Sequence, residues 1–165
     1  MTHTTIITHD MATPVGVLRL VVDGDYLVRI EFGAGESGQP GNKATAAAAS
    51  RALLKECERQ LQEYFEGHLR QFDLPLRAAG TAFQQEVWDA LRTIPYGEVC
   101  SYGDIARAIQ RPRAVRAVGA ANGRNPLPIV VPCHRVIGSN GSLTGFAGGL
   151  AMKTQLLQLE GALLI

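Results

Sequence analysis

The period of the hydrophobic pattern changes early in the chain, and this change limits the possible folds more than any other feature. Strand-forming residues come first, in short runs over residues 4–8, 16–22 and 26–32. Asp23-Gly24 separates the last two runs and predicts a hairpin turn. Further along, apolar residues recur at helical spacing. The pattern therefore predicts an α+β fold, in which an N-terminal sheet with one helix precedes a mainly helical domain.

Alternation within the third run predicts one buried and one exposed face. Val28, Ile30 and Phe32 are apolar, and the residues between them are charged. Residues 33–42 are rich in Gly, Pro and Ser, which predicts a loop. Apolar side chains at helical spacing then predict a helix over residues 43–65.

A break between two domains is predicted near residue 78. The chain has 165 residues, enough for one sizeable domain or two small ones. Residues 68–79 resemble a connection, and Pro75 and Gly80 interrupt regular structure. We therefore expect an N-terminal domain over residues 1–78 and a C-terminal domain over residues 79–165.

Two capping boxes mark helix starts in the second domain. Thr81 is followed three positions later by Gln84, and Ser101 by Asp104. The helix that begins at Thr81 carries an apolar face, and its Trp88 is expected in the core. The apolar face consists of Phe83, Val87, Leu91 and Ile94.

A helix-turn-helix is predicted next. A short helix ends near Ile109, Pro112 interrupts the pattern, and a second helix spans residues 112–122, with Gly123 as its stop. Antiparallel helix pairs also occur in other helical domains, so the pattern leaves both possibilities open. Small residues beside arginines would let the second helix approach DNA closely. Its two faces are Arg113, Arg116, Ala117 and Ala120, and Val115, Val118, Gly119 and Asn122.

Positive charge is concentrated in one segment, although the net charge of the chain is only +1. Residues 107–135 contain six arginines and no Asp, Glu or Lys. Clustered arginines indicate binding to phosphates. The alternative is a solvated face whose arginines pair with acidic residues elsewhere in the chain.

The N-terminus and the cysteines favour an intracellular protein. Residues 1–10 lack the pattern of a signal peptide, and no apolar run approaches the roughly 20 residues that span a bilayer. Cys57, Cys100 and Cys133 form no CxxC pair, which favours reduced thiols over disulfides or a zinc site. Cys57 falls in the apolar stripe of the first helix and is expected in the core. We expect a soluble, cytoplasmic protein with no metal, no cofactor and no membrane contact.

Cys133 is the candidate nucleophile. Three prolines favour extended backbone through the apolar run that leads to it, at positions 126, 128 and 132. A thiol attacks as the thiolate and needs a nearby base or positive charge, which His134 and Arg135 can supply. Adjacent side chains of a strand point to opposite faces, so we expect a backbone turn or a bridging water between Cys133 and His134. The alternative is a buried cysteine beside a structural histidine.

Glu160 is the candidate partner of that histidine. Met152, Leu156 and Leu159 predict a final helix that Gly161 closes. Glu160 then faces the negative end of the helix dipole, at a cost of roughly 0.3–1 kcal/mol. The carboxylate could orient a histidine that acts as a base, or it could lie exposed without a partner.

The segment around Cys133 carries a specific motif. It consists of Pro132-Cys133-His134-Arg135-Val136, with Asn125-Pro126 before it and Gly145-Phe146-Ala147-Gly148-Gly149-Leu150 after it. This segment closely resembles the O6-alkylguanine-DNA alkyltransferases, also called methylated-DNA-protein-cysteine methyltransferases. The resemblance covers nearly all of residues 80–165 and is weaker before them. It implies an RNase H-like first domain and a winged-helix-like second domain that binds the minor groove of double-stranded DNA.

The resemblance further implies direct-reversal repair of O6-alkylguanine in a single turnover. The damaged guanine is flipped out of the duplex, and Cys133 accepts its alkyl group irreversibly. His134 activates Cys133 through a water, and Glu160 orients His134. Tyr102 protonates or hydrogen-bonds N3 of the guanine, and Arg116 enters the base stack.

The remaining contacts are also implied by the resemblance. Asn125 braces the active-site turn, the carbonyls of Cys133 and Val136 accept from the exocyclic amine of guanine, and the Ala147 N–H meets O6. Many family members have Tyr where this chain has Phe146, and some have Ser in place of Ala147. We expect the protein to be a monomer in solution.

Two other functions stay open at this point. A non-catalytic, alkyltransferase-like damage sensor would bind alkylated DNA without accepting the alkyl group. Such relatives replace the acceptor cysteine, which this chain retains as Cys133. A Cys-His-Glu hydrolase would instead turn over repeatedly on an ester or peptide.

Overall fold

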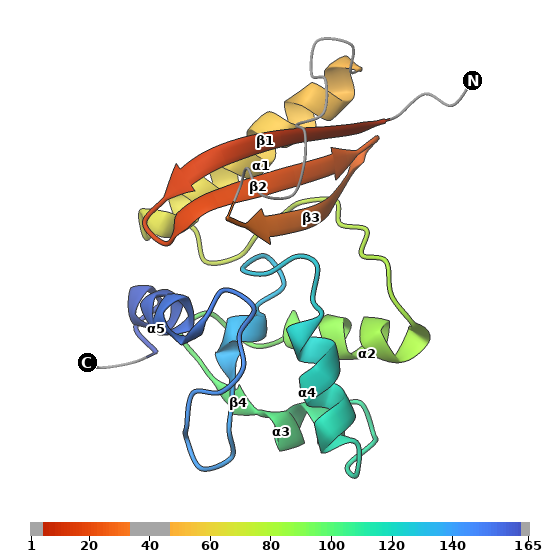
Figure 1. Cartoon of the computed structure of the whole chain (residues 1–165), viewed down its shortest axis with the longest axis vertical. Coiled ribbons are helices and arrows are strands. Elements are labelled where there is room, and N and C mark those ends of the chain that lie inside the picture. Colours follow the sequence, from red (N-terminus) through yellow and green to blue (C-terminus); the bar gives the residue numbers. More distant parts are fainter. Residues whose placement is uncertain (1–4, 34–46, 163–165) are drawn as a thin grey trace. The chain divides into compact units, whose positions relative to one another are not determined.

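The computed structural model describes residues 5–33 and 47–162 of the chain. The chain divides into two compact units, Met1–Ala79 and Gly80–Ile165. The first unit contains a sheet and a helix, and the second is mainly helical (Figure 1). The α+β fold class predicted from the hydrophobic pattern is confirmed.

A three-stranded antiparallel sheet forms the first unit. Its strands, in spatial order, are β1 (Ile6–Thr13), β2 (Gly16–Asp23) and β3 (Tyr26–Phe32) (Figure 1). The predicted end of β1 at residue 8 is wrong, because β1 pairs with β2 along its whole length. Polar residues 8–10 interrupt the hydrophobic pattern and so concealed the second half of the strand.

The hairpin between β2 and β3 turns one residue later than predicted. Asp23 pairs with Tyr26, so the turn residues are Gly24 and Asp25 rather than Asp23 and Gly24. Gly24 has a φ of 61°, in the left-handed region that two-residue hairpin turns require. The glycine therefore fixes the position of the turn.

A β-bulge breaks the alternation predicted for β3. The register shifts between Val21 and Val22, whose partners are Arg29 and Leu27, and Val28 is left between them. Leu27 and Ile30 are buried, whereas Val28 is only half-buried. The extra residue of a bulge moves the side chains on one side of it to the other face of the strand.

Helix α1 (Ala48–Phe65) packs across one face of this sheet (Figure 1). The predicted start at residue 43 is wrong, because Ala47 has extended backbone angles and the helix begins after it. Residues 34–46, which include most of the predicted loop, lie outside the described residues. Cys57 is fully buried in α1, and burial raises the pKa of its thiol to about 12. Cys57 is the core thiol that its position predicted.

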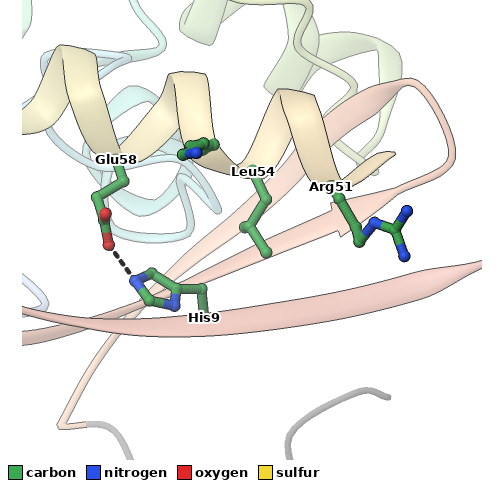
Figure 2. A pocket seen from close by; sticks show the side chains of 5 residues that line it. His9, Arg51, Leu54 and Glu58 are labelled. Atoms are coloured by element: carbon green, nitrogen blue, oxygen red, sulfur yellow. Dashed lines mark hydrogen bonds and ion pairs between the residues drawn. The ribbon is translucent and has the colours of Figure 1, made fainter. Parts of the chain in front are cut away.

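A hollow of about 240 Å³ lies between β1 and α1 (Figure 2). His9 of β1 and Glu58 of α1 form a hydrogen bond at its edge (Figure 2). The other lining residues are Arg51, Leu54 and Lys55. None of the predicted site residues lines this hollow. All of those residues belong to the second unit.

Helices dominate the second unit. They are α2 (Ala82–Leu91), α3 (Tyr102–Ala108), α4 (Val115–Gly123) and α5 (Leu150–Leu159) (Figure 1). The short strands β4 (Cys100–Ser101) and β5 (Val136–Ile137) pair in parallel. Within the described residues, no helix is long and apolar enough to cross a membrane.

The two helices predicted for the helix-turn-helix are present as α3 and α4, and residues 109–114 connect them (Figure 1). The capping boxes at Thr81 and Ser101 are present at the starts of α2 and α3. The second helix begins at Val115 rather than at residue 112, because Arg111 and Ala114 close a turn in which Ala114 N donates to Arg111 O at 2.9 Å. It ends at Gly123, which was predicted to lie just beyond it.

Trp88 joins α2 to α4. Its side chain is buried, as predicted, and Nε1 donates to the Ala121 carbonyl at 2.9 Å. A buried indole N–H without a partner would cost stability, so this bond fixes how the two helices pack. The scaffold thereby holds α4 in a defined position.

Candidate active site

The chain reaches Cys133 through a folded loop, so the predicted extended passage is wrong. Val131 N donates to Leu127 O at 2.8 Å, and Ile129 between them has a φ of 75°. Asn125 closes the loop, since its Nδ2 donates to Val131 O at 2.8 Å and its Oδ1 accepts from Leu127 N at 3.0 Å. Prolines exclude helix but tolerate turns, which is why the extended prediction failed.

A single turn of 3-10 helix, η2 (Cys133–Arg135), presents the candidate nucleophile. Arg135 N donates to Pro132 O at 3.0 Å and closes the turn. Of the two arrangements expected between Cys133 and His134, the backbone turn is therefore present. Both side chains are buried.

The Cys133 thiol is held in its neutral form. Only 5% of the residue is exposed, and burial raises the pKa of the thiol to about 11. A hydrogen bond from Asn125 and the positive charge of Lys153 oppose this shift without overcoming it. The thiolate is the nucleophilic form, so Cys133 needs a base before it can attack.

His134 and Glu160 form a buried pair that can supply this base. Nε2 of His134 lies 2.7 Å from Oε2 of Glu160, and both side chains are 0% exposed. Burial lowers the pKa of His134 below its ordinary value, although the Glu160 carboxylate favours protonation. The imidazole is therefore neutral at neutral pH, the form that accepts a proton. Its Nδ1 is buried and has no hydrogen-bond partner among the described residues.

Glu160 is turned inward by the end of α5. The helix ends at Leu159, and Gly161 follows with a φ of 77°, as the sequence predicted. Ala162 N donates to Leu157 O at 2.9 Å, which completes a Schellman motif. Of the two possibilities for this carboxylate, the partnered one is correct.

Arg135 is the second partner of Glu160, which the sequence did not reveal. Its Nε donates to Oε1 at 2.8 Å and its NH2 to Oε2 at 3.0 Å, while NH1 donates to Ile94 O at 2.7 Å. Counting Arg135 among arginines that bind phosphate was therefore wrong, because its charge is buried and paired. Removal of one partner of such a pair costs about 3–5 kcal/mol.

The other arginines of residues 107–135 divide into two groups. Arg107 is bonded to Asp104, and Arg111 NH2 lies 3.2 Å from Glu86 Oε2. For these two, the alternative of pairing with acidic residues is correct. Three exposed arginines have no ion pair within the described part of the chain: Arg113, Arg116 and Arg124.

The outer face of α4 carries small and positive residues. Arg116, Ala117 and Ala120 are exposed on it, and Arg113 is exposed in the turn before the helix. Val115 belongs to the opposite face but is 41% exposed, because the packed part of α4 begins only at Val118. On the inner face, buried Asn122 donates to the Cys133 carbonyl at 3.4 Å. One helix thus presents an arginine surface outward and contacts the acceptor turn inward.

Lys153 and Tyr102 meet at the carbonyl of Thr144. Tyr102 OH donates to Thr144 O at 3.1 Å, and Lys153 Nζ donates to the same oxygen at 2.8 Å and to Val136 O at 2.6 Å. Lys153 is fully buried in α5, and burial lowers its pKa. The sequence prediction missed it because lysine is rarely fully buried. The one available signal was its position three residues before Leu156, on the buried side of the helix.

Phe146 and Ala147 lie in the loop before α5, where Phe146 is half-buried and Ala147 is exposed. A Cβ atom at Gly148 would lie 3.0 Å from the Phe146 ring and 2.5 Å from Met152 Sδ. A side chain at this position would therefore require Met152 and the Phe146 ring to shift. Within residues 5–33 and 47–162, no cluster of His, Cys, Asp and Glu could hold a metal ion.

Two family models together match nearly the whole chain. The ribonuclease-like domain of 6-O-methylguanine DNA methyltransferase matches residues 6–78, and the DNA binding domain of 6-O-methylguanine DNA methyltransferase matches residues 82–162. The chain belongs to this methyltransferase family. The resemblance drawn from the motif around Cys133 is confirmed.

Similar proteins with curated names support the same assignment. The methylated-DNA--protein-cysteine methyltransferase of Methanosarcina acetivorans is 47% identical over 150 residues, which cover 91% of this chain and 95% of the relative. The constitutive methylated-DNA--protein-cysteine methyltransferase of Bacillus subtilis is 48% identical over 151 residues, which cover 90% of this chain and 91% of the relative. The crystal structure of Mycobacterium tuberculosis OGT in complex with DNA has a TM-score of 0.82 at 43% identity and covers 94% of this chain and 92% of that one.

Proposed function

We propose that the protein repairs DNA by direct reversal, transferring the alkyl group of O6-alkylguanine to its own Cys133 in a single turnover. The observation that carries this proposal is the buried thiol on the turn next to the His134–Glu160 pair. Membership of the methyltransferase family supports the same reaction. The acceptor and DNA-binding residues all lie in residues 79–165, which we propose as the functional domain.

The chemistry begins with proton removal from Cys133. The thiol proton passes through a water to Nδ1 of His134, while Glu160 accepts a hydrogen bond from Nε2. The thiolate attacks the alkyl carbon, so that an S–C bond forms as the C–O6 bond breaks. The electron pair stays with the guanine, and Tyr102 protonates or hydrogen-bonds N3 as the base departs.

Polar groups around the acceptor would bind the extruded base. The carbonyls of Cys133 and Val136 accept from the exocyclic amine, and the exposed Ala147 offers its N–H to O6. Asn125 contributes by holding the loop that leads to Cys133. The Val136 carbonyl accepts from Lys153 with one lone pair and retains the second for the guanine.

The outer face of α4 would bind the minor groove of double-stranded DNA. Ala117 and Ala120 permit close approach, Arg113 contacts phosphate, and Arg116 enters the stack as the guanine flips out. Extrusion is chemically necessary, since a sulfur atom cannot approach the alkyl carbon in line while the base is stacked.

The test is a stoichiometry measurement on duplex DNA that contains O6-methylguanine. The protein should take up one methyl group per molecule and then stop, with the added mass on the tryptic peptide that contains Cys133. A hydrolase or a repeatedly acting enzyme would continue past one equivalent. A damage sensor without acceptor chemistry would bind the duplex and gain no mass.

Replacing Arg116 by alanine should slow methyl transfer more than it weakens binding to undamaged duplex DNA. Unstacking a base costs a few kcal/mol, so loss of the inserted side chain should slow transfer about 10–100-fold. Single-turnover rates and dissociation constants for undamaged DNA measure the two effects. Equal losses in both would indicate that Arg116 only contacts phosphate.

Replacing Arg113 by alanine should weaken binding to damaged and undamaged duplexes alike. Its guanidinium is exposed, and each phosphate contact contributes close to one counterion, so the slope of log K against log salt should fall by about 1. Anisotropy titrations at several salt concentrations measure this slope. Arg107→Ala is the matched control, because Arg107 is already bonded to Asp104. An unchanged slope in Arg113→Ala would exclude a phosphate contact.

We propose a cytoplasmic location and a monomeric state. The reaction consumes a reduced thiol, and the free cysteines fit a reducing compartment. The proposed transfer requires no metal and no cofactor, because the acceptor, the base and the orienting carboxylate are all side chains of this chain.

A further inference from the structure

Arg135 forms two hydrogen bonds with Glu160, the carboxylate that orients the candidate base His134. Its Nε and NH2 donate to the two oxygens of Glu160 at 2.8 and 3.0 Å, a fork that matches the planar carboxylate. Its third nitrogen donates to Ile94 O at 2.7 Å, and the guanidinium carbon lies 5.7 Å from the centre of the Tyr96 ring. The Arg135 side chain is only 7% exposed, and these contacts hold its guanidinium in place.

This ion pair decides where the proton between Glu160 and His134 lies. A carboxylate paired with a guanidinium is ionised, and an ionised carboxylate only accepts hydrogen bonds. The hydrogen between Oε2 of Glu160 and Nε2 of His134 therefore belongs to Nε2. A neutral imidazole carries one N–H, so Nδ1 keeps its lone pair.

The surroundings of His134 favour that neutral form. The charged groups that act on it are Arg135 on η2, Lys153 on α5 and Glu160, the residue that caps the end of α5. Cys133 precedes it on η2. Burial is the largest influence and lowers the pKa of His134, and the positive charges of Arg135 and Lys153 lower it further. The pairing of Glu160 with Arg135 also reduces the charge that could stabilise an imidazolium.

We propose that Arg135 is a positioning residue, which holds Glu160 ionised and oriented and thereby fixes the Nε2–H tautomer of His134, with Nδ1 left to accept the proton of Cys133. This inference rests on the proposed function, because the proton transfer is the first step of that reaction. Arg135 acts through Glu160 and touches neither the acceptor sulfur nor the DNA. Its position in the sequence next to His134 gives no indication of this role.

The experiment is nitrogen NMR of histidine-labelled, full-length protein across a range of pH. In the wild type, His134 should show a protonated Nε2 and an unprotonated Nδ1, and should titrate below the ordinary range of histidine. A wild-type His134 with its proton on Nδ1 would overturn the proposal without any variant.

The Arg135→Met variant should hold less of its His134 in the neutral Nε2–H form at any given pH. Its His134 titration should move up by about one unit, a tenfold change in the protonation equilibrium. Arg135→Lys keeps the charge and should restore the wild-type titration at least in part. Arg111→Met, which removes an exposed arginine paired with Glu86, is the control and should change nothing at His134. A folded Arg135→Met protein with an unchanged tautomer and titration would contradict the proposal.

Methyl transfer from O6-methylguanine is measured in parallel as a separate result. If the wild type transfers no methyl group, the proposed function fails, while the tautomer of His134 is still decided by the NMR spectrum. If the wild type is active and Arg135→Met is folded, the variant's transfer rate should depend on pH with its midpoint displaced upward, which a merely structural role would not produce.

Discussion

A Cys133→Ser variant is expected to take up no methyl group from duplex DNA that contains O6-methylguanine, whereas the wild type takes up one. The hydroxyl of serine is a far weaker acid than a thiol, and the pKa of the Cys133 thiol is already raised to about 11 by burial. A base that can deprotonate Cys133 would therefore not deprotonate serine. Mass spectrometry of the tryptic peptides measures the transfer directly.

Cys100→Ser is the matched control for this variant. Cys100 is half-buried in β4, and burial raises the pKa of its thiol to about 11 as well. Burial therefore raises the pKa of both thiols to a similar value, but only Cys133 adjoins the His134–Glu160 pair along the chain. Full transfer by Cys100→Ser is expected, and a methyl group found on Cys100 or Cys57 would contradict the assignment.

His134→Gln is expected to slow methyl transfer by about 100- to 10,000-fold, the usual contribution of a general base. The glutamine amide can still donate a hydrogen bond to Glu160, and Glu160 keeps its two bonds to Arg135. The fold should therefore survive while the proton acceptor is lost. Single-turnover rates on the same duplex measure the effect, and thermal unfolding checks the fold.

The pH dependence of the same rates provides an internal control. Burial lowers the pKa of His134, so the imidazole stays neutral and able to accept a proton through neutral pH. Transfer by the wild type should fall only at pH values below the ordinary range of histidine. His134→Gln should lose this acidic limb, and a wild-type rate equal to that of the variant at every pH would show that His134 is not the base.

The acceptor turn and helix α4 are in direct contact. Asn122 of α4 is bonded to the carbonyl of Cys133, so the helix proposed to bind DNA and the acceptor turn are in direct contact. We therefore expect a shift of α4 to displace the turn that carries Cys133. Close packing of buried groups transmits such displacements.

Local features were the part of the structure that the sequence could predict well. The capping boxes at Thr81 and Ser101, the closing Gly161 and the core position of Cys57 all depend on neighbouring residues or on a period, and all are present. The motif around Cys133 identified the family for the same reason, because a short stretch of chain carries it.

Predictions failed where a residue's role depends on distant parts of the chain. The alternation in β3 was broken by a bulge opposite β2, and polar residues 8–10 form a strand only because β2 offers them backbone partners. Prolines excluded helix before Cys133 but could not choose between an extended run and the loop that Asn125 closes.

The amino-acid sequence by itself determined which residues could do the chemistry, since a thiol, an imidazole and a carboxylate have their reactivity wherever they lie. Only the tertiary structure decided which of them work together. Arg135 was predicted among the arginines that bind phosphate and is instead buried against Glu160. The sequence did not single out Lys153, which is fully buried beside Val136 and Thr144. Burial and partners come from side chains brought together by folding, and those set the charge and protonation of a group.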